Sequence, residues 1–256
     1  MKNLLTLFFL LLACSSFGQR TVFGGHNNYV APVAPPVLET NGLVLYLNAN
    51  SYSGLGTTWS DLSGQSNTAT LVGSPTYTAS PASFTFGPNV IATTTKSDVS
   101  LTTATFIAWV NSSQTQGSYT GIIFSRSGHG GSNVPATGMD LYQNNSVGYH
   151  WADTQASYNW NSGLLVPNNQ WAMIAISVSA SSVTAYLCTA SGITSATNSN
   201  AHSALSGLNF FIACDPGDKA SRAFNGKIAT AMIYNSAMSL AAITSTFNAQ
   251  KSAFGL

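Results

Sequence analysis

The residues best suited to chemistry lie in one segment, GMDLYQNNSVGYHWA, over residues 138–152. Apolar and polar residues alternate on both sides of an Asn-rich centre, which is typical of a β-hairpin. A three-residue turn over Asn144 to Ser146 pairs positions whose numbers sum to 290, and this register keeps the apolar residues on one face. It places Asp140 opposite His150 on the other, polar face.

The polar face of this hairpin would also carry Tyr142, so that a carboxylate, an imidazole and a phenol lie together. These groups can exchange hydrogen bonds with the hydroxyl groups of a sugar. We therefore expect a ligand-binding cluster of Asp140, Tyr142 and His150. The alternative is a cross-strand charge pair on an open sheet face, which would contribute less than about 1 kcal/mol.

Three aromatic residues, Tyr158, Trp160 and Trp59, are candidate stacking platforms for sugar rings. Large aromatic residues also pack in protein cores, and that alternative stays open for each of them.

Carboxylates in turns suggest a calcium site. Asp215 and Asp218 lie in CDPGD, and Asp61 lies in TTWSDLSGQSNTATL, so these three are the candidate ligands. Both segments also fit plain turn chemistry: D-P-G-D is a common β-turn, and Asp61 can accept backbone N–H groups of the turn at Ser63 while Trp59 covers the core edge.

Two cysteines, Cys188 and Cys214, follow apolar strand-like runs. In an oxidising compartment such a pair indicates a disulfide. Two buried free thiols are the alternative.

Catalytic signatures are scarce. Glu39 is the only glutamate, whereas a glycosidase needs two carboxylates that flank the bond. No G-x-S-x-G segment occurs, and the histidines lack zinc-binding spacing. We therefore expect a protein that is not an enzyme, with no certain cofactor and with calcium as the one candidate.

Composition narrows the class further. Only 6% of the 256 residues are charged, and 45% are hydrophobic. The first 18 residues contain an apolar run and predict a signal peptide that leaves Gln19 as the first residue, while LLAC offers a second route with a lipidated Cys14. Either route predicts a secreted or cell-surface protein. Without a basic patch, nucleic acid is not an expected partner, and no transmembrane segment is expected.

The rest of the chain predicts an all-β fold. Residues 19–40 are rich in Pro and Gly and suggest an extended arm. From residue 41 onward, short apolar runs alternate with turn residues, which indicates a two-sheet antiparallel β-sandwich. Several runs, such as FIAWV, are apolar on both faces, as expected for strands covered on both sides. A short C-terminal helix should begin after Ser239 as N-cap and seal one edge of the sandwich.

Two segments carry a family resemblance: NGLVLYLNANSYSGLGTTWSDLSGQSNTATL near the start, and FNGKIATAMIYNSAMSLAAITSTFNAQKSAFGL at the end. Over residues 41–256 the chain resembles the laminin-G-like, concanavalin A-like lectin/glucanase superfamily, in particular its bacterial and phage branch. The resemblance implies a jelly roll that serves carbohydrate binding or adhesion. The E-x-D-x-x-E strand of the hydrolytic members is absent, so their catalytic role is not carried over.

We therefore expect a secreted, non-enzymatic lectin-like module that binds a glycan or a surface protein. The alternative is a structural or adhesive subunit that self-associates, with the arm adding a strand to a neighbour's sheet. A glycoside hydrolase is the third and weakest hypothesis.

Overall fold

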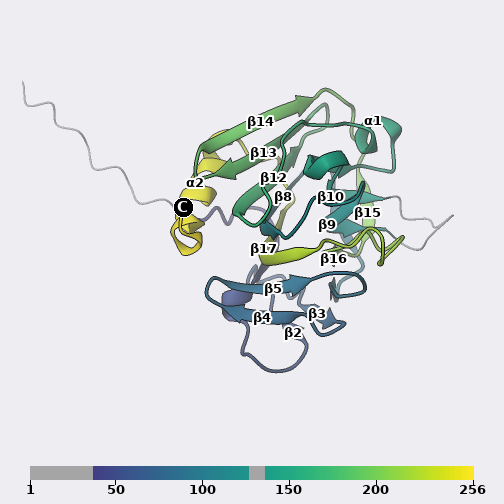
Figure 1. The fold of residues 1–256 in the computed structure, drawn as a ribbon. Coiled ribbons are helices and arrows are strands. Elements are labelled where there is room, and N and C mark those ends of the chain that lie inside the picture. Colours follow the sequence, from purple (N-terminus) through teal and green to yellow (C-terminus); the bar gives the residue numbers. More distant parts are fainter. Residues whose placement is uncertain (1–36, 127–135) are drawn as a thin grey trace, which may run out of the picture. The chain divides into compact units, whose positions relative to one another are not determined.

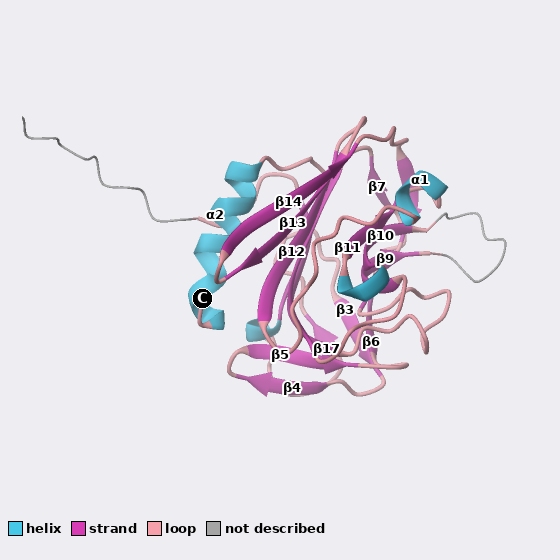
Figure 2. Cartoon of the chain, turned by 45° about the horizontal axis from the view of Figure 1, so that its top comes forward, coloured by secondary structure: helices cyan, strands magenta, loops and turns pink. Residues whose placement is uncertain are grey.

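The computed structural model describes residues 37–126 and 136–256, which fold as two large antiparallel β-sheets packed against each other (Figures 1 and 2). The predicted β-sandwich is confirmed. The expected signal peptide, Cys14 and residues 19–36 of the expected arm lie outside the described residues.

The larger sheet has eight strands. Seven of them follow the order β14-β13-β12-β8-β17-β5-β4. The eighth, β1, pairs with β17 on the same side as β5. Its strands are β1 (Leu43–Asn48), β4 (Thr76–Ala79), β5 (Ala82–Phe86), β8 (Ala104–Ser112), β12 (Trp171–Val178), β13 (Val183–Thr189), β14 (Gly192–Asn198) and β17 (Gly226–Tyr234).

The smaller sheet has seven strands in the order β11-β10-β9-β16-β6-β3-β2. They are β2 (Thr58–Trp59), β3 (Ala69–Val72), β6 (Ile91–Thr94), β9 (Thr120–Ser125), β10 (Thr137–Leu141), β11 (Val147–His150) and β16 (Phe211–Ile212). A further two-stranded ladder joins β7 (Val99–Leu101) to β15 (Leu205–Leu208).

The central strands of the larger sheet, β8, β12 and β17, are buried on both faces. One face packs in the core between the sheets, where Phe106, Ala108 and Ile174 are fully buried. The other face carries a second apolar cluster that includes Trp109, Met173 and members of the C-terminal helix. This arrangement explains why FIAWV in β8 and WAMIAI in β12 carry apolar residues toward both faces of the sheet, as the sequence predicted.

The C-terminal helix α2 (Leu240–Gln250) begins where the sequence predicts. Ser239 Oγ accepts a hydrogen bond from the Ala242 N–H at 3.3 Å. The helix covers the outer face of the larger sheet and not an edge, which corrects the expected position (Figure 2). The reason is the second apolar cluster, because Ile243 and Phe247 complete it.

Shorter helical segments occupy the connections. They are α1 (Gln155–Tyr158) and the 3₁₀ turns η1 (Ala49–Ser51) and η2 (Gln143–Asn145), while a third 3₁₀ turn, η3 (Lys251–Phe254), directly follows α2. Among the described residues, no helix is long and apolar enough to span a bilayer.

Asp61 links β1 to the loop between β2 and β3. Its carboxylate accepts backbone hydrogen bonds from Tyr46 at 2.9 Å, Ser63 at 2.9 Å and Asn67 at 2.8 Å, and one from the Ser63 hydroxyl at 2.7 Å. Trp59 is fully buried, with its ring edge-on to Phe84 at 4.9 Å. Asp61 therefore accepts the backbone N–H groups of a turn and Trp59 packs in the core, as the structural alternative predicted. Trp59 is not accessible as a stacking platform.

We predict that Asp61→Ala lowers the free energy of unfolding by roughly 2–3 kcal/mol, because it leaves several backbone N–H groups without their charged acceptor. Urea denaturation measures the change. Asp98→Ala, at an exposed position, is the matched control and should change the stability little. Equal effects of the two variants would contradict the structural role of Asp61.

His202 is a buried histidine in the connection after β14. Its Nε2 lies 3.1 Å from the Tyr149 hydroxyl and its Nδ1 lies 2.8 Å from the Ser179 carbonyl oxygen. Burial lowers the pKa of His202 below its ordinary value, and the contact with the carbonyl oxygen opposes this shift only in part.

Because the folded pKa of His202 lies below the unfolded one, the unfolded chain binds more protons once the pH falls below about 6.5. The protein should therefore lose stability as the pH falls from there toward the folded pKa. We predict that His202→Gln shows a smaller drop in Tm than the wild type between about pH 7.5 and pH 5. An identical drop would show that His202 does not contribute.

Candidate functional site

The hairpin of β10 and β11 has a different register from the expected one. Asp140 pairs with Gly148 and not with His150, and His150 pairs with Gly138. The turn is η2, one residue earlier than expected, because Asn144 adopts the left-handed conformation at φ 56°, which Asn tolerates. Moving the turn by one residue changes each pairing by two, so every side chain keeps its predicted face.

Asp140 and His150 nevertheless meet across the diagonal of the hairpin. Asp140 Oδ2 lies 2.8 Å from His150 Nδ1. The two atoms lie within ion-pair distance, and neither of them makes a hydrogen bond among the described residues. Gly148 makes the contact sterically feasible, because a Cβ at this position would lie 2.6 Å from Asp140 Oδ1.

This pair does not lie on an open sheet face, as the sequence suggested. Asp140 is 1% exposed and His150 is 3% exposed. The ring of Tyr158 stacks on the imidazole at 5.5 Å, and Tyr119 and Phe124 approach it edge-on at 5.5 and 5.0 Å. Aromatic rings thus remove the pair from water, which makes an unpaired partner costly.

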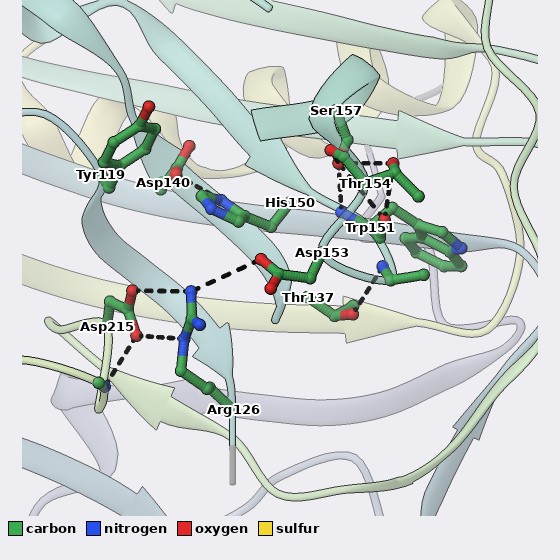
Figure 3. Close-up of polar contacts among 12 residues, drawn as sticks. Tyr119, Arg126, Thr137, Asp140, His150, Trp151, Asp153, Thr154, Ser157 and Asp215 are labelled. Carbon is green, nitrogen blue, oxygen red and sulfur yellow. Dashed lines mark hydrogen bonds and ion pairs between the residues drawn. The ribbon is translucent and has the colours of Figure 1, made fainter. Parts of the chain in front are cut away.

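Beside His150 lies an open pocket with a volume of ≈ 230 Å³. Its lining residues Tyr119, Arg126 and Asp153 are drawn in Figure 3. Two tyrosines, two arginines, one aspartate and the imidazole edge line it. We call it the aromatic pocket and define it by Tyr119, Arg126, His150, Asp153, Tyr158 and Arg222.

Asp215 holds both arginines in place (Figure 3 shows Arg126). The carboxylate is fully buried and accepts hydrogen bonds from Arg126 Nε at 3.0 Å and Arg222 Nη1 at 2.7 Å. The Arg222 guanidinium also lies over the Tyr119 ring, 5.3 Å from its centroid. Charge-assisted bonds of this kind are short and directional, so both guanidinium groups are pre-oriented at the pocket wall.

Tyr119 remains protonated at neutral pH. Burial raises the pKa of its phenol, and the neighbouring Tyr142 and Asp140 add to the rise. Its hydroxyl lies 3.4 Å from Asn159 Oδ1 as a donor. The phenol can therefore both donate and accept a hydrogen bond at the pocket rim.

Strained backbone surrounds the aromatic pocket. Tyr119, Ala152 and Asp153 are not glycines, yet their φ angles are 63°, 53° and 54°. Each such residue costs on the order of 1–3 kcal/mol, and such residues cluster at ligand sites. The surrounding packing therefore holds Tyr119 and Asp153 in orientations that the local sequence does not favour.

Four of the five expected ligand-binding residues come together. Asp140, His150 and Tyr158 form the core of the cluster, and the Tyr142 ring lies 5.6 Å from that of Tyr119. Trp160 does not join them, because it packs edge-on against Tyr149, whose side chain points into the core between the sheets.

Sequence reasoning missed Tyr119, Arg126, Asp153 and Arg222. Arg222 follows the predicted turn CDPGD and comes from a region of the chain distant from β10 and β11. No local pattern marks these residues, because only the pairing of the smaller sheet brings their segments together.

The three aspartates proposed as calcium ligands already have other partners for their carboxylate oxygens. The Asp61 carboxylate is used by the turn at Ser63, that of Asp215 by two arginines, and that of Asp218 by Ala220 and Ser221. Among residues 37–126 and 136–256, no three His, Cys, Asp or Glu side chains are grouped as metal ligands.

The disulfide prediction is wrong in this structure. Cys188 and Cys214 are free and fully buried, Cys188 under α2 on the larger sheet and Cys214 in the segment after β16. Burial raises the pKa of each thiol to about 12, so both remain protonated at neutral pH. The apolar runs thus reflect core positions and not a covalent link.

The comparisons with known proteins agree with this architecture. The Concanavalin A-like lectin/glucanases superfamily matches residues 85–244, more than half of the sequence, and the chain belongs to this family. The comparison with curated proteins found no match.

Two solved structures illustrate the likeness. Domain 4 of AbnA, an extracellular GH43 arabinanase from Geobacillus stearothermophilus solved with arabinotriose, has a TM-score of 0.60 at 17% identity and covers 83% of this chain and 100% of its own. A Trypanosoma rangeli sialidase in complex with the inhibitor DANA has a TM-score of 0.61 at 16% identity and covers 88% of this chain and 37% of its own. At these identities the likeness shows the fold alone.

We predict that Asp215→Ala destabilises the protein by about 3 kcal/mol, since removing one partner leaves the arginines without their buried counter-charge. Thermal and urea unfolding measure the loss. The matched control Asp218→Ala, whose carboxylate only accepts exposed hydrogen bonds from Ala220 and Ser221, should change the stability much less. Comparable losses in both variants would contradict the ion-pair account.

Proposed function

We propose that the chain is an exported, non-enzymatic carbohydrate-binding module that holds a saccharide in the aromatic pocket. The observation that carries the proposal is the combination of the half-buried rings of Tyr119 and Tyr158 with two pre-oriented guanidinium groups around one opening. Tyrosine offers an apolar face for a sugar ring and a polar hydroxyl for its substituents.

The chemistry of the pocket rim suits hydroxyl groups. Arg126 and Arg222 keep some exposure, with 18% and 33% of their side chains accessible, and each has N–H donors beyond those used by Asp215. Asp153 supplies an acceptor, with 48% of its side chain exposed. Because Asp215 and the packing fix these groups, little ordering entropy remains to be lost on binding.

Asp140 and His150 act beneath this surface. The imidazole is 3% exposed, so it presents at most an edge to a ligand and supports the Tyr158 ring that stacks on it. Their role in the proposal is positional: they fix the platform on which the sugar rests.

The proposal predicts that Tyr158→Ala weakens saccharide binding by tenfold or more, because it removes buried apolar area together with an aromatic contact that contributes about 0.5–1.5 kcal/mol beyond that area. Tyr158→Phe keeps the ring and should retain most of the affinity. A glycan array identifies the ligand, and isothermal titration calorimetry measures the variants. Wild-type affinity in Tyr158→Ala, or no glycan bound at millimolar concentration, would contradict the proposal.

The non-enzymatic part of the proposal has its own test. Incubation of the protein with the glycans that it binds should release no reducing sugar. Release that depends on Asp153 or Asp140 would show a hydrolase instead.

One observation favours the adhesive alternative. β14 is an edge strand of the larger sheet, its residues GITSATN are uncharged and free of proline, and all of them are exposed or half-buried. Such an edge lacks the usual protection against strand addition. A neighbouring copy could supply residues from the arm, whose last part, at Val37 and Glu39, hydrogen-bonds to Ser245 and Tyr234 of the same chain.

If the arm pairs with β14 of another copy, deleting residues 19–36 should convert an oligomer into a monomer. Size-exclusion chromatography with light scattering compares the two proteins. A monomer in both cases would remove this alternative. The intact mass of the mature protein shows whether export leaves Gln19 or a lipidated Cys14 at its start.

A further inference from the structure

We infer that the chain has a second binding site, for an uncharged polyhydroxyl ligand such as a short neutral saccharide, between the end of α2 and the outer face of the larger sheet. The inference stands independently of the aromatic pocket. The two sites lie on opposite sides of the sandwich, since Met139 and Tyr149 face the core between the sheets and Asp140 and His150 therefore take the outer face of the smaller sheet.

The site is a pocket of ≈ 440 Å³, larger than the aromatic pocket. Its volume falls within the range of about 300–1,000 Å³ that is typical of small-molecule sites. β1, β17, the turn between β4 and β5, α2 and η3 all contribute, so the walls come from segments far apart in the sequence.

The lining has no charged side chain. It combines amide and hydroxyl groups with apolar rings, and includes Tyr46, Asn48, Asn50, Pro81, Gln250 and Phe254. An ion would find no counter-charge here and would lose its hydration. A neutral ligand with many hydroxyl groups would find donors, acceptors and an apolar ring face.

Several polar groups of the lining have unused hydrogen-bonding capacity. Gln250 Oε1 accepts from Trp109 Nε1 at 2.6 Å, and this bond fixes the side chain while its Nε2 has no partner among the described residues. The Asn50 side chain likewise makes no hydrogen bond there, because only its backbone N–H is bonded, to Asn48. Thr230, at 3% exposure, has a buried hydroxyl without a partner.

The backbone of β17 places Thr230 at this pocket. The pairing with β8 shifts between Ile228 and Thr230, so Ala229 and Thr230 both line the pocket on the outer face. A β-bulge redirects a side chain in this way, and bulges are common beside binding sites.

The apolar wall is rigid. The Phe254 ring stacks on Trp109 at 4.0 Å with an interplanar angle of 15°. Since Trp109 also bonds Gln250, one buried indole fixes both an aromatic and an amide group of the site. A ligand that contacts either group should therefore change the environment of the Trp109 indole N–H.

The test is a ¹H,¹⁵N NMR titration of the full protein with maltose, cellobiose, xylobiose and arabinobiose. At least one of them should shift the Trp109 indole and the Gln250 side-chain amide signals. Digalacturonate, which carries carboxylates, should shift neither. The inference fails if no neutral disaccharide moves these signals, or if digalacturonate moves them equally.

Ala249→Leu provides the variant, because Ala249 lines the pocket near the end of α2 and leucine suits a helix. Its larger side chain should fill the pocket and reduce the shifts at Trp109 and Gln250 at least tenfold at equal ligand concentration. Ala241→Leu, at an exposed position of the same helix, is the matched control and should leave them unchanged. Undiminished shifts in Ala249→Leu would overturn the assignment.

The same spectra separate this site from the aromatic pocket. Shifts at the backbone amides of Tyr119, His150 and Tyr158 report binding there, and Ala249→Leu should not change them. Each site can therefore fail while the other stands.

Discussion

The burial of the Asp215 carboxylate is the constraint on which the aromatic pocket depends. A carboxylate without water must be paired, and this chain has few cations with which to do it. Arg126 and Arg222 both converge on it and so line the aromatic pocket together with Tyr119 and His150. The need to pair the buried Asp215 carboxylate thus positions the two arginines of the aromatic pocket.

The second organising feature is the double coverage of the larger sheet. Its inner face packs against the smaller sheet, and its outer face packs under α2. The smaller sheet instead leaves the outward face of β10 and β11 to Tyr119 and Tyr158, and this difference opens the aromatic pocket. Where α2 ends, the cover over the larger sheet is incomplete, and the second pocket lies there.

Local sequence patterns predicted the elements well. Alternation in GMDLYQ and VGYHWA assigned the correct faces to Asp140 and His150, because period-two geometry depends only on the backbone. Ser239 marked the start of α2 through a single capping bond. The turn position was wrong by one residue, since the run Gln143–Asn145 has two residues that accept a positive φ and the sequence does not show which turn the tertiary contacts select.

Long-range relations could not be predicted. Nothing near Arg222 or Tyr119 in the sequence indicates that they meet, and the placement of α2 on a sheet face follows from packing against Met173 and Trp109. The cysteines illustrate the same limit. The sequence shows that Cys188 and Cys214 follow apolar runs, but it does not show whether the two runs are neighbours in the fold. The family resemblance predicted the fold but not the arrangement of side chains at the pocket.

The central claim is that the aromatic pocket binds a saccharide through its tyrosine faces and its anchored arginines. A crystal structure of the protein with an oligosaccharide identified on a glycan array tests this most directly. The account predicts a sugar ring against Tyr158 with hydroxyl groups within hydrogen-bond distance of Arg222. A bound sugar found only elsewhere on the molecule, with the aromatic pocket free of it, would contradict the account.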